Sequence, residues 1–282
     1  MELFRQLDLQ DLLKRALHED LGLGDITTAA TVTPGQRGRA RITVKDERIV
    51  FCGGPIIEPV FAMAGGEPKI TALADEGQEL TRGASVVEVE GRLAGLLIGE
   101  RTALNFLQLM SGIATATRQF VNAVAGTRAR IVDTRKTHPG LRAVEKYAVR
   151  AGGGFNHRFG LDSGVLIKEN HIAAAGSVTS ALEKARRLAP HTLRIEIECE
   201  TLDQVEEALK AGADAILLDN MSLDDIRRAR ELAGECVILE VSGGVTLATV
   251  RAIAETGVDL ISVGALTHSA KAADLSMRIE PA

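Results

Sequence analysis

Residues 194–220 read RIEIECETLDQVEEALKAGADAILLDN, and this stretch decides the fold of the chain. Two nearly continuous apolar runs, RIEIECE and AILLDN, have the composition of buried strands. The segment between them, LDQVEEALKAGA, has apolar residues at helical spacing and ends at Gly212, where a left-handed residue can cap a helix. Apolar runs that alternate with amphipathic segments are typical of parallel strands covered by helices, so the stretch predicts an α/β fold.

The same pattern repeats on both sides of this stretch. Further runs are ARIVD, GVLIKEN, VILEVSGG and LISVGAL, and the ends of successive runs lie roughly 21 to 35 residues apart, the length of one strand–helix unit. We count about six units, whereas a full (β/α)8 barrel has eight. Three explanations stand: the barrel is incomplete, a strand is hidden near Phe155, or the sheet is open and doubly wound. Glycine loops at the late strand ends favour a barrel.

The region before Gly126 has a different texture. A helix is expected from about Leu3 to His18. β-Branched residues and partial alternation predict strands at ARITVKDERIV, KITALA and SVVEVEG, with a short helix, PIIEPVFAMAGG, between the first two. The helical periodicity of residues 93–124 is interrupted near Ser111 and Gly112, and this segment is expected to connect two domains. The opening region is therefore α+β.

Composition and charge exclude several classes of protein. The chain has 282 residues, 45% hydrophobic and 25% charged, which suffices for one large core or two moderate ones. No apolar run approaches the roughly 20 residues that span a bilayer, and the charged N-terminus is unlike a signal peptide, so we expect a cytoplasmic protein without a membrane partner. The chain has a net charge of −5 and no Trp, so we do not expect it to bind nucleic acid. Three cysteines without CxxC spacing predict neither a disulfide framework nor a zinc site.

Polar residues or glycine follow each predicted parallel strand. These ends are Asp133-Thr134-Arg135-Lys136, Lys168-Glu169-Asn170, Glu198, Asp219-Asn220, Ser242-Gly243-Gly244 and Gly264-Ala265. In parallel α/β folds the carboxyl ends of the strands face the active site. One charged residue in such a loop is as often merely solvated, but several that converge on one mouth favour a site.

Basic residues gather at these ends although the chain is acidic overall. They are Arg135, Lys136 and Lys168, with His157 and Arg158 in the loop GGGFNHR. Arginine offers paired donors to carboxylates and lysine a compact cation, so the cluster predicts a ligand with several carboxylates or phosphates. The alternative is a set of structural salt bridges with Glu145, Asp162 and Glu169.

Two acidic strand ends suit a sugar. Glu198 and Asp219 can accept hydrogen bonds from ribose hydroxyls, bind Mg²⁺ directly or through water, and stabilise a cationic sugar carbon. As caps of the following helices they are less suited than Thr201 and than Ser222 or Asn220.

Glycines mark the last two strand ends, in SGG and at Gly264. They let backbone N–H groups approach a phosphate, at the place where TIM barrels bind one. His138 and His171 lie close to the predicted loops and have no assigned role. No HExxH, Walker A or Rossmann glycine pattern is present, which excludes zinc-protease, P-loop and dinucleotide-binding functions.

Three long segments carry a family resemblance. They are DTRKTHPGLRAVEKYAVRAGGGFNHRFGLDSGVLIKENHI, IEIECETLDQVEEALKAGADAILLDNMS and EVSGGVTLATVRAIAETGVDLISVGALTHS. Together with GDITT and GERTALNFLQLMSGIAT they closely resemble quinolinate phosphoribosyltransferases, over essentially the whole chain. The resemblance implies transfer of a phosphoribosyl group from phosphoribosyl pyrophosphate to quinolinate with loss of CO2, giving nicotinate mononucleotide and pyrophosphate in de novo NAD biosynthesis.

The resemblance also implies an architecture and an assembly. We expect an α/β chain with an N-terminal α+β sandwich over residues 1–112, joined by the C-terminal tail 268–282, and an incomplete barrel of about seven strands over residues 113–267. It further implies a homodimer or a dimer-based hexamer, in which Arg101 on the connecting helix enters the active site of the neighbouring subunit.

Residue roles follow from the same resemblance. The quinolinate carboxylates would be held by Arg135, His157, Arg158 and Lys168, with Lys136 nearby. Glu198 and Asp219 would bind the ribose hydroxyls and Mg²⁺ of phosphoribosyl pyrophosphate. The 5′-phosphate would be held by Ser242, Gly243, Gly244 and Gly264, and Thr134 and Ala265 complete the substrate-binding set. The catalytic set is Lys136, Lys168, Glu198 and Asp219.

The expected mechanism needs no covalent enzyme nucleophile. The cations orient the dicarboxylate so that its ring nitrogen faces the sugar carbon, and the ribosylated, cationic nitrogen then stabilises the carbanion left by CO2. Tight pairing of the departing carboxylate would stabilise the ground state, so the 2-carboxylate should be held less tightly than the 3-carboxylate.

Three alternatives accompany this interpretation. A lyase would use Lys168 as a Schiff-base amine. A related transferase for another acid, or a paralogue in metal-cofactor transport, would have fewer site cations. A non-catalytic phosphate-binding protein would need neither Glu198 nor Asp219.

Overall fold

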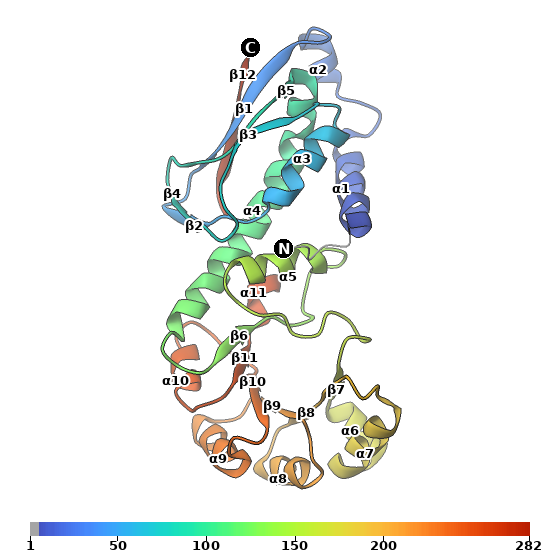
Figure 1. Ribbon diagram of the computed structural model, residues 1–282, viewed down its shortest axis with the longest axis vertical. Helices are drawn as coiled ribbons and strands as arrows, with labels where there is room; N and C mark the ends of the chain where they lie inside the picture. The colour runs from blue at the N-terminus through green and yellow to red at the C-terminus, as the bar shows by residue number, and fades with distance from the viewer. Residues whose placement is uncertain (1–5) are drawn as a thin grey trace. The chain divides into compact units, whose positions relative to one another are not determined.

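The computed structural model describes residues 6–282 and divides the chain into two compact units (Figure 1). The first holds the described residues up to Arg118, together with His138–Gly153 and Ser269–Ala282. The second holds Gln119–Thr137 and Gly154–His268. The predicted α/β class, with an antiparallel α+β unit and an incomplete barrel of parallel strands, is confirmed.

The first unit contains an antiparallel sheet in the order β12-β1-β5-β3. These strands are β12 (Leu275–Pro281), β1 (Arg37–Val44), β5 (Ser85–Arg92) and β3 (Lys69–Leu73). Residues of β1 alternate between exposed and buried because successive side chains point to opposite faces, and only one face is covered. The run ARITVKDERIV, predicted as one strand, is divided between β1 and β2 (Arg48–Val50), which pairs separately with β4 (Glu79–Thr81).

In Figure 1, α3 (Gly54–Met63) and part of α4 (Leu93–Ala123) lie along this sheet, and α1 (Gln6–Leu21) packs against α3. The unit also contains α2 (Ile26–Thr31) and α5 (Arg142–Ala151). The predicted start of the first helix, Leu3, lies outside the described residues. Asp25 caps α2 by accepting a hydrogen bond from the backbone N–H of Thr28 at 3.0 Å.

Helix α4 is continuous from Leu93 to Ala123, so the predicted interruption near Ser111 and Gly112 is wrong. Both residues serve tertiary contacts instead. The Ser111 hydroxyl accepts from Cys52 N–H and donates to the Cys52 carbonyl, each at 3.1 Å. A Cβ on Gly112 would lie 2.2 Å from the Lys271 carbonyl oxygen, so only glycine lets the C-terminal tail pass this close. No helix within residues 6–282 is long and apolar enough to cross a membrane.

The second unit contains a parallel sheet in the order β6-β11-β10-β9-β8-β7. Its strands are β6 (Arg130–Val132), β7 (Val165–Ile167), β8 (Ile195–Cys199), β9 (Ala215–Asp219), β10 (Ile238–Ser242) and β11 (Leu260–Ser262). In the described chain β6 and β7 do not pair, which leaves the barrel incomplete. Near Phe155, where a hidden strand was one of the three explanations, there is a single parallel bridge from Phe155 to Val132.

Helices follow these strands along the chain and flank the sheet in Figure 1. They are α6 (Glu169–Ala175), α7 (Val178–Leu188), α8 (Leu202–Lys210), α9 (Leu223–Ala233), α10 (Val250–Ala254) and α11 (Ala265–His268). Thr201 caps α8 and Ser222 caps α9, each accepting from the backbone N–H three residues on. Thr201 is the predicted cap of α8, and Ser222 rather than Asn220 caps α9, which leaves Glu198 and Asp219 to another role.

Two aspartates make the same pair of hydrogen bonds at the amino ends of the parallel strands. Asp214 N–H donates to the Ile195 carbonyl at 3.1 Å, and its carboxylate accepts from Ile195 N–H at 2.8 Å. Asp259 repeats the exchange with Leu239, at 3.0 and 2.9 Å. The sequences GADA and GVDL therefore place one aspartate at the start of β9 and one at the start of β11, each tied to the strand before it.

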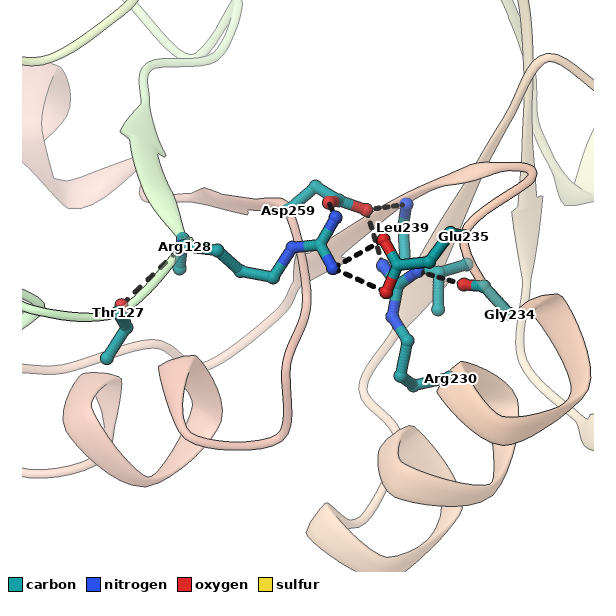
Figure 2. A network of polar contacts seen from close by, with 8 residues as sticks. Thr127, Arg128, Arg230, Gly234, Glu235, Leu239 and Asp259 are labelled. Atoms are coloured by element: carbon teal, nitrogen blue, oxygen red, sulfur yellow. Dashed lines mark hydrogen bonds and ion pairs between the residues drawn. The ribbon is translucent and has the colours of Figure 1, made fainter.

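Asp259 has a further set of partners, shown in Figure 2. Its carboxylate hydrogen-bonds Arg230, whose side chain is only 13% exposed. It also pairs with Arg128 Nη2 at 2.7 Å, and Arg128 reaches Glu235 as well. This network ties β6, α9 and the amino end of β10 together on the side of the sheet opposite the carboxyl ends.

Candidate active site

A cavity of about 550 Å³ opens at the carboxyl ends of the parallel strands. Its predicted lining residues are Thr134, Arg135, Lys136, His157, Arg158, Lys168, Glu198, Asp219, Ser242, Gly243 and Gly244. It is also lined by Leu166, Glu169, Leu217, Asn220, Glu240 and Ser262. The structure therefore brings the predicted strand ends together in one pocket of the second unit.

Three predicted site residues lie outside this lining. Gly264 and Ala265 form the turn into α11, and a Cβ on Gly264 would lie 3.0 Å from Lys136 Cδ, so this turn borders the Lys136 loop. Arg101 belongs to the first unit, where its side chain is exposed on α4. Its predicted entry into a neighbouring subunit stays a prediction.

Arg158 and Arg135 create a positive field in the pocket. Arg158 donates to the Gly164 carbonyl at 3.0 Å, which fixes the guanidinium without neutralising it. Burial, and then the charge of Arg135, hold the pKa of Arg158 below its ordinary value. Two guanidinium groups that repel one another favour an anionic ligand between them.

Lys168 pairs with Glu198 rather than with Glu169, the structural partner considered from sequence. Lys168 Nζ lies 2.6 Å from Glu198 Oε2, and the Glu198 side chain is 5% exposed. Glu169 instead accepts from Asn170 at 2.8 Å. A Schiff-base lysine must present its nitrogen to a carbonyl carbon, whereas Lys168 Nζ is engaged by the Glu198 carboxylate, which counts against the lyase alternative.

The turn after β10 has the geometry of an anion site. Gly243 has φ +95° and Gly244 φ +58°, values that favour glycine. A Cβ on Gly243 would lie 2.1 Å from Asn220 Oδ1, because Asn220 packs across the turn and donates its N–H to the Ser242 carbonyl at 3.0 Å. Neither glycine N–H donates to another residue of the described chain, so both can serve a ligand.

His157 is held from both sides, by Glu196, which sequence reasoning missed, and by the backbone of Arg158. Its Nε2 lies 3.0 Å from Glu196 Oε2, and its Nδ1 accepts from the backbone N–H of Arg158 at 2.7 Å. Asp133 accepts from His157 N–H at 2.9 Å. The ring therefore positions the backbone of Arg158, next to the pocket.

Glu240 is the second group that was missed. It lines the cavity at 1% exposure, and its Oε1 is 3.7 Å from His157 Nε2. Strand alternation is the signal that could have found both glutamates. Glu196 lies two residues before Glu198, and Glu240 two before Ser242, so each shares the inward face of a site residue.

The two histidines left without a role lie outside the pocket lining. His138 belongs to the first unit and pairs with the buried Glu145 at 2.5 Å. His171 Nδ1 accepts from the backbone N–H of Lys168 at 3.0 Å at the start of α6. The His171 contact holds the backbone that presents Lys168.

Glu198 and Asp219 are the carboxylates that suit a magnesium ion. They line the cavity from the neighbouring strands β8 and β9, and Mg²⁺ is usually bound by one or two carboxylates together with substrate phosphates. Asp219 accepts from the Asn220 amide at 2.8 Å and keeps further acceptor sites. The donor set therefore fits an ion that arrives with a phosphorylated substrate.

Comparisons with known proteins agree with this geometry. Residues 25–111 match the model of the quinolinate phosphoribosyl transferase N-terminal domain, and residues 113–278 that of the C-terminal domain. A probable nicotinate-nucleotide pyrophosphorylase (carboxylating) of Bacillus subtilis is 45% identical over 97% of this chain and 94% of its own length. The nicotinate-nucleotide pyrophosphorylase (carboxylating) of Mycobacterium leprae is 42% identical over 95% of this chain and 96% of its own length. The crystal structure of NadC from Streptococcus pyogenes has a TM-score of 0.95 at 40% identity, over 99% of each chain.

Proposed function

This chain belongs to the quinolinate phosphoribosyltransferase family, and we propose that it transfers the phosphoribosyl group of phosphoribosyl pyrophosphate to quinolinate with loss of CO2. The products are nicotinate mononucleotide, pyrophosphate and CO2, and the step belongs to de novo NAD biosynthesis. The carrying observation is one pocket that combines Arg135, Arg158 and Lys168 with the carboxylates of Glu198 and Asp219. This combination matches a dicarboxylic acid beside a sugar phosphate.

The cations hold quinolinate. Arg135 and Arg158 each offer a planar fork to a carboxylate, and Lys168 adds a point charge. His157 acts through Arg158, whose backbone it holds. Oriented in this way, the ring nitrogen of quinolinate faces the anomeric carbon, so most of the acceleration comes from positioning.

The remaining wall receives phosphoribosyl pyrophosphate. The Ser242-Gly243-Gly244 turn holds the 5′-phosphate through the Gly243 and Gly244 N–H groups, which have no partner in the described chain, and the separate turn at Gly264 and Ala265 adds to this phosphate site. Glu198 and Asp219 accept hydrogen bonds from the ribose hydroxyls and bind Mg²⁺, directly or through water. When bound, this ion neutralises charge on the departing pyrophosphate.

The reaction balances without an enzyme nucleophile. The ring nitrogen forms a bond to the anomeric carbon as the bond from that carbon to pyrophosphate breaks. The bond from C2 to its carboxylate then breaks, the electron pair stays on C2 beside the cationic nitrogen, and a proton replaces CO2. The chain binds, orients and excludes water, while the substrate provides the electron sink.

The test is product formation from quinolinate, phosphoribosyl pyrophosphate and Mg²⁺, with nicotinate as the alternative acid. Nicotinate mononucleotide should form from quinolinate, not from nicotinate, and only with Mg²⁺. Arg135→Ala should abolish it, and Arg187→Ala, an exposed arginine on α7, should not. No product from the wild-type protein would refute the proposal, and equal loss in both variants would refute the assignment of Arg135.

The assembly is tested separately. We propose a homodimer or dimer-based hexamer in which Arg101 completes the site of a neighbouring subunit. Arg101→Ala and Lys168→Ala should each be inactive, and mixing them under conditions of subunit exchange should restore part of the activity. No recovery in verified mixed assemblies would refute the shared site. The cytoplasmic location stays a prediction.

A further inference from the structure

Two carboxyl groups surround one histidine nitrogen inside the barrel. Glu196 on β8 and Glu240 on β10 come from alternate strands, which contribute to the same layer of a barrel interior. His157 Nε2 lies 3.0 Å from Glu196 Oε2 and 3.7 Å from Glu240 Oε1. The cluster forms the inner wall of the pocket, since Glu240 and His157 line the cavity.

The histidine supplies only one proton to this cluster. Its Nδ1 accepts a hydrogen bond from the backbone N–H of Arg158 at 2.7 Å, so a proton on Nδ1 would clash with the amide hydrogen of Arg158. The ring is therefore the neutral tautomer with its proton on Nε2, directed at the nearer carboxylate, Glu196. Glu240 Oε1 lies farther from Nε2, at 3.7 Å, so His157 offsets only part of the cost of burying this carboxyl group.

A carboxylate close to Glu240 disfavours a second negative charge there. The shared proton resides on Glu240, whose side chain is 1% exposed against 12% for Glu196. Burial, and then the charge of Glu196, raise the pKa of Glu240 to about 8, with a smaller contribution from Asp133 at the end of β6. His157 and the hydroxyl of Ser262 on β11 act in the opposite direction without reversing the shift.

One oxygen of this carboxyl group has no partner. Glu240 Oε1 is buried without a hydrogen bond among the residues that the structure describes. A buried polar atom of this kind costs free energy until a ligand or water completes it. It lies in the wall of the cavity that also holds Arg135, Arg158 and Lys168.

We propose that Glu240 is a further substrate-binding residue, which as a neutral carboxylic acid donates a hydrogen bond to a carboxylate of the acid substrate. This inference rests on the proposed function. An ionised Glu240 would repel a dicarboxylate. The neutral acid can instead form a hydrogen bond with a ligand carboxylate, which gives the buried Glu240 oxygen a partner. It also holds that carboxylate without a full countercharge, which suits a group that must leave as CO2.

A metal ion is the other occupant that this cluster suggests, since ligand atoms of His157, Glu196 and Glu240 lie within 4.8 Å of one another. The tautomer argues against it. With Nδ1 accepting from Arg158, ligation through Nε2 would require an imidazole without any ring proton. The cluster is therefore arranged to hold a proton rather than a cation.

Three variants test the proposal. Glu240→Gln keeps a neutral donor of the same size, Glu240→Met keeps the volume but removes the donor, and Glu231→Gln changes an exposed glutamate of α9 as a control. Quinolinate affinity is measured by calorimetry without phosphoribosyl pyrophosphate, at pH values well below and well above 8. Circular dichroism establishes that each variant is folded.

At the lower pH, Glu240→Met should bind quinolinate roughly tenfold or more weakly than wild type, and Glu240→Gln should bind close to wild type. At the higher pH wild type should weaken more than Glu240→Gln, because only wild type gains a charge. The infrared difference between wild type and Glu240→Gln at neutral pH should contain the C=O stretch of a protonated carboxyl group.

Three results would each overturn this inference: wild-type affinity in Glu240→Met, equal pH dependence of binding in wild type and Glu240→Gln, or the absence of this C=O stretch. The proposed function would still stand if the wild-type protein converted quinolinate. A wild-type protein that neither binds nor converts quinolinate would overturn both.

Discussion

Removing the Asp259 carboxylate should destabilise the barrel more than removing that of Asp214. Both carboxylates accept a backbone N–H at the start of a strand, at 2.9 and 2.8 Å. A hydrogen bond to a charged group contributes about 1.5–3 kcal/mol, so Asp214→Ala should lower the free energy of unfolding by about 2 kcal/mol. Asp259→Ala also leaves the 13%-exposed Arg230 without its carboxylate, which should cost a further 1–3 kcal/mol or so.

The assay is urea unfolding followed by circular dichroism, because the chain has no Trp to report by fluorescence. Asp259→Asn separates the effects, since an amide oxygen still accepts from Leu239 N–H but carries no charge. Equal losses for the two alanine variants, or a wild-type midpoint for Asp259→Asn, would refute the role assigned to the arginine pairing.

The pH dependence gives an independent check. Burial acts to raise the pKa of Asp259, but the Leu239 N–H, Arg230 and Arg128 outweigh it and hold that pKa below its ordinary value of 3.8. The stabilisation is therefore fully present above the pKa of the unfolded carboxyl group and is lost as the pH falls through the lowered pKa of the folded state. The difference in the free energy of unfolding between wild type and Asp259→Asn should be largest near neutral pH and should vanish in acid.

Other predictions concern the pocket, the long helix and the substrate. Gly243→Ala should raise the KM for phosphoribosyl pyrophosphate about tenfold or more, because the added Cβ would lie 2.1 Å from Asn220 Oδ1 at a φ of +95°; an unchanged KM would refute a phosphate site at this turn. Gly112→Ala should lower the free energy of unfolding by about 2 kcal/mol or more, since its Cβ would lie 2.2 Å from the Lys271 carbonyl oxygen; calorimetry that finds wild-type stability would contradict this close approach. In a crystal structure with a quinolinate analogue, the 3-carboxylate should make more cationic contacts than the 2-carboxylate, and the reverse would contradict the decarboxylation argument.

Much of the site was readable from strand ends. A parallel strand must finish on the side where its loops gather, so an apolar run followed by Glu198, Asp219 or Ser242 locates the residue without any knowledge of the fold. The helix caps were readable for the same local reason, since Thr201 and Ser222 satisfy backbone groups only a few residues away.

Other features escaped because they depend on partners distant in sequence. Ser111 and Gly112 are residue types that often interrupt a helix. Here Ser111 hydrogen-bonds the backbone of Cys52, and Gly112 makes room for the C-terminal tail near Lys271. In the sequence Glu240 looks like an ordinary exposed strand residue. That it holds a proton depends on its neighbours Glu196 and His157, which come from other parts of the chain.

The sequence by itself determined the α/β class, the order of the strand–helix units and the set of cations and carboxylates at the strand ends, because each depends on local pattern and on the direction of parallel strands. Only the tertiary structure decided that α4 runs unbroken, that Lys168 pairs with Glu198, and that Glu196 and Glu240 share one histidine. Those outcomes depend on distances between side chains that lie far apart along the chain, and burial sets their energies.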